Sequence, residues 1–145
     1  MKKKIRINGL GGQGVKYCAS LFGKILDKQG RNVSLVLDYD TAARGGSITS
    51  DLIVSDGKVD SPIIDKADVS IDMTNNLVTV DGKEKSFSSI IEEKKSDFKA
   101  LQTNMFYLGL LLKKMSVKLD LEYIKKILKE KFLEENLKSI EIGYQ

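Results

Sequence analysis

The sequence predicts an α/β layer fold with a mainly parallel sheet, a β-hairpin and helices gathered at the C-terminus. Three observations carry this prediction: a strand pattern that leads into a glycine-rich corner, a helical repeat directly after it, and a second apolar strand pattern. Strand, helix and strand in that order form a βαβ unit. The length of 145 residues suits a single domain over residues 1–145.

The first strand is expected over residues 3–8, and it leads into the corner "INGLGGQGV" at Ile7–Val15. Apolar residues then recur at the spacing of an amphipathic helix: Val15, Cys18, Ala19, Phe22, Ile25 and Leu26. Gly30 is expected to end this helix as a left-handed C-cap. The segment "NVSLVLDYD" predicts a buried strand with Asp38 and Asp40 at its acidic end, which completes a Rossmann-like βαβ unit.

The rest of the chain predicts a loop over residues 41–47, a strand over 48–54 and a further short strand in "ADVSIDM". The Asp-Gly pair in "LVTVDGKEKSF" predicts a two-residue hairpin turn. The last third has a helical stripe at Phe98, Leu101, Met105, Leu108, Leu112 and Met115. Asp120 is expected to N-cap another helix with apolar positions at Leu121, Ile124, Leu128 and Phe132. A short helix and a tail are expected to close the chain.

The composition excludes several kinds of chemistry. The chain has one cysteine, Cys18, and no histidine. An internal disulfide, a metal or iron–sulfur site held by several thiolates, and histidine-assisted catalysis are therefore excluded for this chain alone. No catalytic residue, no metal site and no cofactor bound by this chain alone are predicted. Cys18 lies on the apolar stripe of the first helix, which favours a buried, inert thiol.

Charge and hydropathy indicate neither nucleic acid nor a membrane as partner. The net charge is +4, but the lysines alternate with glutamates in "SIIEEKKSDFKA" and "YIKKILKEKFLEEN", as on solvated helix faces. The longest apolar stretch, "MFYLGLLL", is too short to span a bilayer. No apolar signal-peptide run follows the basic "MKKK", so we expect a cytoplasmic protein.

The glycine corner has two readings. Gly9, Gly11 and Gly14 match the spacing G-x-G-x-x-G between a strand and a helix, and Asp38 follows about where a ribose-binding acid belongs. Backbone amides at such a helix start can bind an anion, which would suit a free-standing dinucleotide- or nucleotide-binding protein. The glycines equally suit a tight turn and close helix–strand packing, and the spacing leaves both readings open.

Read with the rest of the chain, the corner indicates a family. The motifs "GLGGQGV" at 9–15, "ARGGSITSDLIVSD" at 43–56 and "SPIIDKAD" at 61–68 are followed by Asn104 and Gly109 in "NMFYLG", by "FLEEN" and by "GY". This series resembles the gamma subunit, or gamma domain, of the 2-oxoacid:ferredoxin oxidoreductases, which oxidise pyruvate, 2-oxoglutarate or branched 2-oxoacids such as 2-ketoisovalerate. The resemblance covers nearly the whole chain.

The resemblance implies that this chain is one subunit of a larger catalyst and is inactive alone. In the family, a 2-oxoacid is decarboxylated to an acyl-CoA while electrons pass to ferredoxin. Thiamine diphosphate, CoA and iron–sulfur clusters are implied in partner subunits of the alpha, beta and delta types, and ferredoxin is reached through the complex. The gamma part is expected to complete the assembly and the surroundings of the active site. A purely structural interaction module is a weaker alternative.

The residues expected to contact a ligand or a partner lie in the two glycine motifs. They are Gly9, Gly11, Gly12, Gln13, Gly14, Arg44, Gly45, Gly46 and Ser47. Arg44 offers a permanent cation for a carboxylate, a phosphate or a partner subunit, or else pairs with Asp38 or Asp40. Gln13 could donate to a ligand oxygen from the helix start, although capping the turn is the more common role of such a residue. Gly11 or Gly12 is expected to have a positive φ.

The C-terminal helices carry two further expectations. Asn104 lies on the apolar stripe and is expected to tie its helix to a loop, or to meet a partner subunit. Phe106, Leu110 and Leu111 lie off that stripe, so they are expected to form an exposed apolar patch with the rim around Arg44–Ser47. A homodimer that covers this patch is expected when the chain is isolated.

Overall fold

The computed structural model describes residues 2–39, 46–57 and 66–145. The chain forms two compact units, Met1–Ser88 and Ser89–Gln145. The expectation of a single domain over residues 1–145 stays a prediction.

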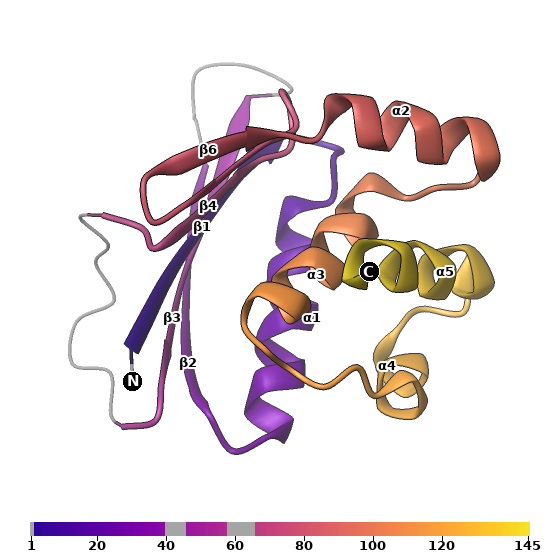
Figure 1. Cartoon of the computed structure of the whole chain (residues 1–145). Helices are drawn as coiled ribbons and strands as arrows, with labels where there is room; N and C mark the ends of the chain where they lie inside the picture. Colours follow the sequence, from indigo (N-terminus) through magenta and orange to yellow (C-terminus); the bar gives the residue numbers. More distant parts are fainter. Residues whose placement is uncertain (1, 40–45, 58–65) are drawn as a thin grey trace. The chain divides into compact units, whose positions relative to one another are not determined.

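The first unit is a six-stranded sheet together with the helix α1 (Figure 1). Its elements are β1 (Lys2–Leu10), α1 (Val15–Lys28), β2 (Asn32–Tyr39), β3 (Ser47–Ser55), β4 (Val69–Asp72), β5 (Leu77–Val80) and β6 (Lys83–Ser86). The order of the strands in the sheet is β2-β3-β1-β4-β5-β6.

The prediction of a mainly parallel sheet is wrong. Among the described strands, β1 and β4 pair in parallel, whereas β1–β3, β2–β3, β4–β5 and β5–β6 are antiparallel. The βαβ unit exists, but β3 lies between its two strands and runs antiparallel to both. Alternation along a sequence indicates that a segment is extended, but it does not indicate which later strand inserts between two earlier ones.

The helix α1 follows the prediction closely. The predicted apolar positions are buried, and Leu21 is buried with them. At the C-terminal end, the Arg31 amide donates to the Leu26 carbonyl (3.2 Å) and the Gly30 amide donates to the Asp27 carbonyl (2.9 Å). Gly30 has a φ of 82°. These are the two bonds of a Schellman motif, so the predicted glycine C-cap is confirmed.

The second strand, β2, differs from its prediction because it lies at an edge of the sheet. Leu35 is 36% exposed and Val36 is 41% exposed. No described side chain of β2, over residues 32–38, is buried. Among the described strands, β3 is the one neighbour of β2, so no described strand pairs with the outer side of β2.

The hairpin between β5 and β6 is confirmed. Val80 pairs with Lys83 across the turn, and Asp81 and Gly82 occupy its two central positions. Their φ values are 50° and 82°. Positive φ at both central residues is typical of a type I′ turn, which suits the right-handed twist of paired strands and favours an Asp-Gly sequence.

The second unit is helical. Its elements are α2 (Ser88–Asp97, whose first residue closes the first unit), α3 (Thr103–Lys114), α4 (Leu121–Ile127) and α5 (Leu133–Tyr144). The Asp120 carboxylate accepts from the Tyr123 amide (3.1 Å), so the predicted N-cap is confirmed. The predicted helix through Phe132 instead ends at Ile127, and Phe132 has a φ of 61°. The closing helix α5 is longer than the predicted short helix and tail.

The helices α3 and α5 pack closely through two glycines. A Cβ at Gly109 would overlap the Ile140 carbonyl and lie 2.9 Å from the Tyr144 amide nitrogen. A Cβ at Gly143 would in turn overlap the Phe106 carbonyl. Only residues without a side chain allow two helix backbones to approach this closely. The Tyr144 hydroxyl also donates to the Val117 carbonyl (2.8 Å), just beyond the end of α3.

The prediction of an exposed apolar patch on this helix is wrong. Phe106 is 3% exposed, Leu110 is 7% exposed and Leu111 is fully buried. All eight residues from Met105 to Leu112 are buried. A helix that is apolar on every side is a buried helix, so residues outside the predicted stripe belong to the core as well.

Candidate functional site

The glycine corner joins the end of β1 to the start of α1. Gly12 has a φ of 89°, and Gly14, the N-cap residue of α1, has a φ of 78°. Residues with a β-carbon rarely adopt such values, so the two glycines permit the turn itself. The predicted positive φ at Gly11 or Gly12 is therefore confirmed at Gly12, and the helix begins at Val15.

Gly9 has a different task, because it allows α1 to pack closely on β1. A Cβ at this position would lie 2.5 Å from Val15 Cγ2, 2.8 Å from Gln13 Oε1 and 3.5 Å from Met73 Cβ. Val15 is buried and β-branched, so its side chain cannot easily turn away. The structure thus contains the close helix–strand packing that was one of the two readings of the corner.

The Gln13 side chain holds the turn together. Its Oε1 accepts from the Leu10 amide (2.6 Å) and from the Thr74 hydroxyl (3.1 Å). The capping role is therefore the one that the structure shows. Thr74 follows β4, so the Gln13 side chain also links the corner to the next strand of the sheet.

Two amides of the corner are used internally. The Gly11 amide donates to the Gly46 carbonyl (3.2 Å), and the Gln13 amide donates to the Leu10 carbonyl (3.1 Å). These N–H groups are not directed at an external anion, which weakens the reading of the corner as a ready-made anion site.

The bond between Gly11 and Gly46 brings the two glycine motifs together. Leu10, at the end of β1, also pairs with Ser47, at the start of β3. Ser47 is exposed, whereas Gly46 is half-buried. Arg44 and Gly45 lie outside the described residues. We call this region, Gly9–Gly14 with Gly46 and Ser47, the paired-loop end of the sheet.

A row of polar residues crosses the sheet beside the paired-loop end. Asn8 pairs with Thr49 on one side and with Asp72 on the other, and Thr49 pairs with Asp38. The Thr49 hydroxyl donates to Asn8 Oδ1 (2.8 Å). The Asp72 carboxylate accepts from the amides of Thr74 and of the residue after it (2.9 Å and 3.2 Å), so it has a structural role in the turn after β4.

The position of Asp38 argues against a dinucleotide site of the Rossmann type. In that site the acidic residue follows a strand close to the glycine loop. Here β3 lies between β1 and β2, so Asp38 stands two strand spacings, or about 10 Å, from the strand that carries the corner. Its side chain belongs to the row with Thr49 and Asn8, on the sheet face opposite to the one where Gly9 meets Val15.

A charged pair on the same sheet face was not found from the sequence. Arg6 Nε donates to Asp51 Oδ1 (2.7 Å), and Arg6 Nη2 donates to Asp51 Oδ2 (2.9 Å). This side-chain hydrogen bond raises the pKa of Arg6 above its ordinary value. Arg6 lies between the buried Ile5 and Ile7, and Asp51 lies between two buried residues of β3, so both side chains point away from α1. Only the β1–β3 register places them opposite each other.

The remaining predicted residues lie elsewhere. Cys18 is buried in α1, and burial raises the pKa of its thiol to about 12, so the expected inert thiol is confirmed. Asn104 is half-buried in the first turn of α3, in the second unit, and its role stays a prediction.

The described donor groups form no metal site, and the sequence lacks the several thiolates of an iron–sulfur cluster. Over the described ranges 2–39, 46–57 and 66–145, no group of three or more cysteine, aspartate or glutamate side chains is placed to hold a metal ion. The whole sequence offers one thiol and no imidazole. Clusters require several thiolates, so a cluster would have to be held by another chain.

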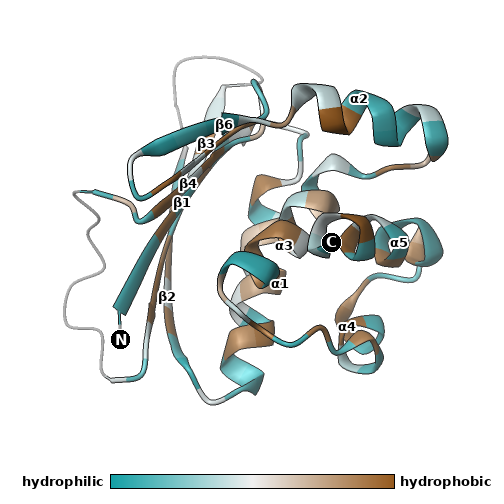
Figure 2. Cartoon of the chain, in the orientation of Figure 1, coloured by the Kyte–Doolittle hydropathy of each residue, from teal (hydrophilic) through white to brown (hydrophobic). Residues whose placement is uncertain are grey.

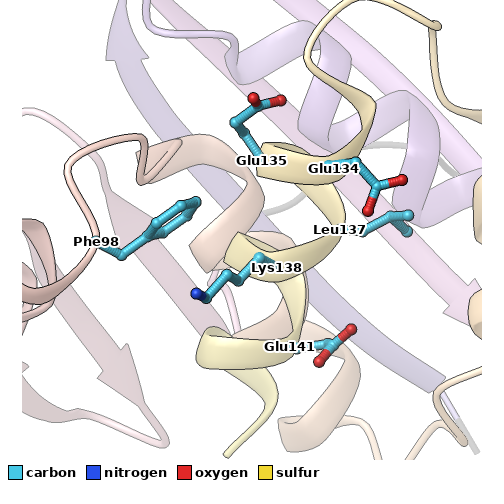
Figure 3. A pocket seen from close by; sticks show the side chains of 6 residues that line it. All are labelled: Phe98, Glu134, Glu135, Leu137, Lys138 and Glu141. Atoms are coloured by element: carbon cyan, nitrogen blue, oxygen red, sulfur yellow. The ribbon is translucent and has the colours of Figure 1, made fainter.

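The second unit has an open cavity of about 400 Å³ on its surface (Figure 3). Its lining consists of Phe98, Glu134, Glu135, Leu137, Lys138 and Glu141. The Lys138 ammonium lies 4.6 Å from the centre of the Phe98 ring. None of the predicted site residues lines this cavity, and three carboxylates against one ammonium give it an acidic character.

In the part of the chain that the structure describes, no helix combines the length and the apolar composition needed to cross a bilayer.

Known structures share this fold over nearly the whole chain. One is the gamma subunit of a keto/oxoacid ferredoxin oxidoreductase from Geobacter sulfurreducens, with a TM-score of 0.69, 21% identity, and coverage of 98% of this chain and 96% of that one. Another is the 2-oxoglutarate:ferredoxin oxidoreductase from Magnetococcus marinus, with a TM-score of 0.72, 17% identity, and coverage of 99% of this chain and 30% of that one. At these identities the similarity concerns the fold.

Sequence relatives match about half of the chain. The 2-oxoglutarate synthase subunit KorC of Archaeoglobus fulgidus is 39% identical over 64 residues, which cover 44% of this chain and 34% of the relative. KorC of Methanothermobacter marburgensis is 33% identical over 79 residues, covering 54% of this chain and 42% of the relative. The match thus spans well under half of each relative's length.

Residues 4–86 match the pyruvate ferredoxin/flavodoxin oxidoreductase family. The chain therefore belongs to the pyruvate ferredoxin/flavodoxin oxidoreductase family.

Proposed function

We propose that this chain is the gamma-type component of a 2-oxoacid:ferredoxin oxidoreductase complex. The family match over residues 4–86 carries the proposal, because it runs from β1 to β6 and includes both glycine motifs. The fold likeness to a gamma subunit extends over 98% of this chain, which supports one gamma-type unit over residues 1–145. The substrate would be a 2-oxoacid, and the names of the relatives make 2-oxoglutarate the first one to test.

In such a complex the cofactor chemistry belongs to partner subunits. Thiamine diphosphate, CoA and iron–sulfur clusters would be held by alpha-, beta- and delta-type subunits, because the donor set of this chain does not fit a cluster. This chain would complete the assembly and the surroundings of the active site. The paired-loop end is the region we expect to face a partner or the substrate channel, since Gly46 and Ser47 lie beside the corner Gly9–Gly14 and Arg44 and Gly45 directly precede them in the sequence. A cytoplasmic location remains part of this proposal.

Reconstitution tests the proposal. The chain is co-expressed with alpha-, beta- and delta-type subunits of the same organism, and 2-oxoacid- and CoA-dependent reduction of a viologen dye or ferredoxin is measured. We expect activity from the complete set and none from this chain alone, even with thiamine diphosphate added. Turnover by the single chain, or full activity of a stable complex that lacks it, would contradict the proposal.

A variant at the paired-loop end sharpens this test. Ser47 is exposed at the start of β3, so Ser47→Trp should leave the fold intact and weaken co-purification with the partner subunits. Lys83→Trp in the exposed strand β6 is the matched control and should assemble normally. Equal loss of assembly in both variants would show that the paired-loop end is not the contact.

Dinucleotide binding is the outcome that would favour the other reading of the corner. Calorimetric titration of the purified chain with NADH is expected to show no binding, because Asp38 is separated from β1 by β3. A micromolar dissociation constant that Asp38→Ala abolishes would replace the proposed function with a nucleotide-binding one.

A further inference from the structure

The two edges of the six-stranded sheet are built differently. β6 is four residues long, has the sequence Lys-Glu-Lys-Ser and is exposed throughout. β2 is eight residues long, and its central residues are Val33, Ser34, Leu35, Val36 and Leu37. Figure 2 shows the contrast, with β6 in the teal of hydrophilic residues and β2 carrying brown hydrophobic ones.

These differences matter because an edge strand presents unpaired backbone N–H and C=O groups. Natural proteins protect such edges with short strands, with charged residues and with proline. β6 has the first two of these protections. Within β2, residues 32–37 contain no charge and no proline, and Leu35 and Val36 are 36% and 41% exposed. An unprotected apolar edge of this length is typical of a strand that pairs with another chain.

We propose that β2 is a docking edge for a second copy of this chain, which pairs antiparallel through its own β2 about a two-fold axis at Leu35. This inference does not depend on the proposed function. Opposite residues of an antiparallel pair point to the same sheet face, so an axis at Leu35 sets Leu35 against Leu35 and Val33 against Leu37 of the second copy. On the other face, Ser34 opposes Val36.

The polar ends of β2 favour the same arrangement. In this register Asn32 opposes Asp38 of the second copy. Asn32 Nδ2 donates one of its two protons to the Gly57 carbonyl (2.8 Å), and among the described residues the second proton has no partner, so it can donate to the carboxylate. Arg31 comes just before Asn32 and gives this end of β2 a positive charge. An antiparallel pair therefore brings the basic end of one strand beside the acidic end of the other.

A second copy suits this edge better than an unrelated strand because the edge is self-complementary. On the sheet face that carries Leu35, apolar residues meet apolar residues, and at the ends of the strand Asn32 meets Asp38. Two-fold pairing also uses one surface twice and closes the assembly, so it does not propagate into a fibre.

Sedimentation of the full chain over a range of concentrations tests the proposal. We expect a dimer, and we expect Val36→Lys to raise its dissociation constant by about tenfold or more, because a lysine in an edge strand opposes pairing. Leu10→Lys is the matched control, since Leu10 is 42% exposed and lies outside β2. It should dimerise like the wild type. A monomer at all concentrations, or a dimer that Val36→Lys leaves unchanged, would overturn the proposal.

Disulfide trapping tests the register. Leu35→Cys places two thiols opposite each other at the axis, so mild oxidation should yield a covalent dimer. Val36→Cys places the two thiols diagonally, further apart, and should cross-link much more slowly. Native Cys18 is buried and does not interfere. Equal rates for both variants, or faster trapping of Val36→Cys, would overturn the Leu35-centred pairing. A complex that forms only with another subunit would show that the edge docks a different chain and would also overturn it.

Discussion

Glycine brings elements unusually close in both units of the molecule, but the atoms that it approaches are different. At the corner, Gly9 lies against the side chains of Val15 and Gln13. In the crossing of α3 and α5, Gly109 and Gly143 each lie against the backbone of the other helix. A side chain can be shortened or can rotate, whereas a helix backbone can withdraw only if the helices separate. We infer that the corner tolerates compensated change and that the helix crossing does not.

The largest effect is expected at the helix crossing. Gly109→Ala places a Cβ on the Ile140 carbonyl, so α5 must move away from α3. Overpacking of this kind costs about 1–3 kcal/mol, and occasionally more. We expect a value at or above the top of this range, since the obstacle is backbone, measured as the free energy of unfolding in urea.

Gly23→Ala in α1 is the matched control. A Cβ there would meet Val33 Cγ1 at 3.7 Å, which is an ordinary contact. Alanine is a better helix former than glycine, so this variant should gain up to about 1 kcal/mol. The same substitution is thus expected to have opposite signs in the two helices. A Gly109→Ala variant as stable as the wild type would mean that α3 and α5 are not in backbone contact.

The next effect is expected at the corner. Gly9→Ala sets a Cβ 2.5 Å from Val15 Cγ2 and should cost about 1–3 kcal/mol. Val15→Ala removes that methyl group and leaves a cavity, so it is destabilising by itself. The double variant Gly9→Ala/Val15→Ala should lose clearly less stability than the sum of the single variants. Strict additivity in the unfolding free energies would refute the side-chain contact as the reason for glycine at this position.

Short-range signals in the sequence predicted much of the structure. The C-cap at Gly30, the N-cap at Asp120 and the turn at Asp81-Gly82 all follow from the conformations that a few adjacent residues prefer. The family resemblance was also available from the sequence, since its glycine motifs lie within the matched residues 4–86.

Long-range pairing could not be read in the same way. β3 comes after β2 in the chain but inserts between β1 and β2. For this reason the sheet is mainly antiparallel instead of mainly parallel, and β2 lies at an edge instead of in the interior. The same limit applies to the site. The bonds from Gly11 to Gly46 and from Arg6 to Asp51 join residues far apart in the sequence, and only the β1–β3 register brings them together. The predicted apolar stripe includes too few of the buried residues of α3. This helix is buried on every side, so it has no polar face that would mark the limits of its buried surface.

A third variant separates backbone conformation from close contact. Gly12 has a φ of 89°, and a Cβ there would meet nothing within 4 Å. Gly12→Ala should therefore cost about 1–2 kcal/mol through left-handed backbone alone. Gly12→Asn should cost less, because asparagine tolerates this region better than alanine does. If thermal or urea unfolding shows that Gly12→Asn is less stable than Gly12→Ala, backbone strain is not the reason for glycine at this position.

The smallest effect is expected for the side chain that caps the corner. Gln13→Ala removes the acceptor of the Leu10 amide and the Thr74 hydroxyl. Both bonds are exposed, so water replaces them in part and the cost should be about 0.5–1 kcal/mol. Gln13→Glu supplies a carboxylate that can accept both bonds and should be as stable as the wild type at neutral pH. Hydrogen bonds to the charged form lower the pKa of the introduced carboxyl group in the folded state. The carboxylate therefore stabilises the fold above its unfolded pKa, and this stabilisation is lost as the pH falls through the folded pKa. Urea unfolding of both variants at neutral and acidic pH checks this. If the unfolding free energy of Gln13→Glu does not change with pH and equals that of Gln13→Ala, the cap contributes nothing to the stability of the corner.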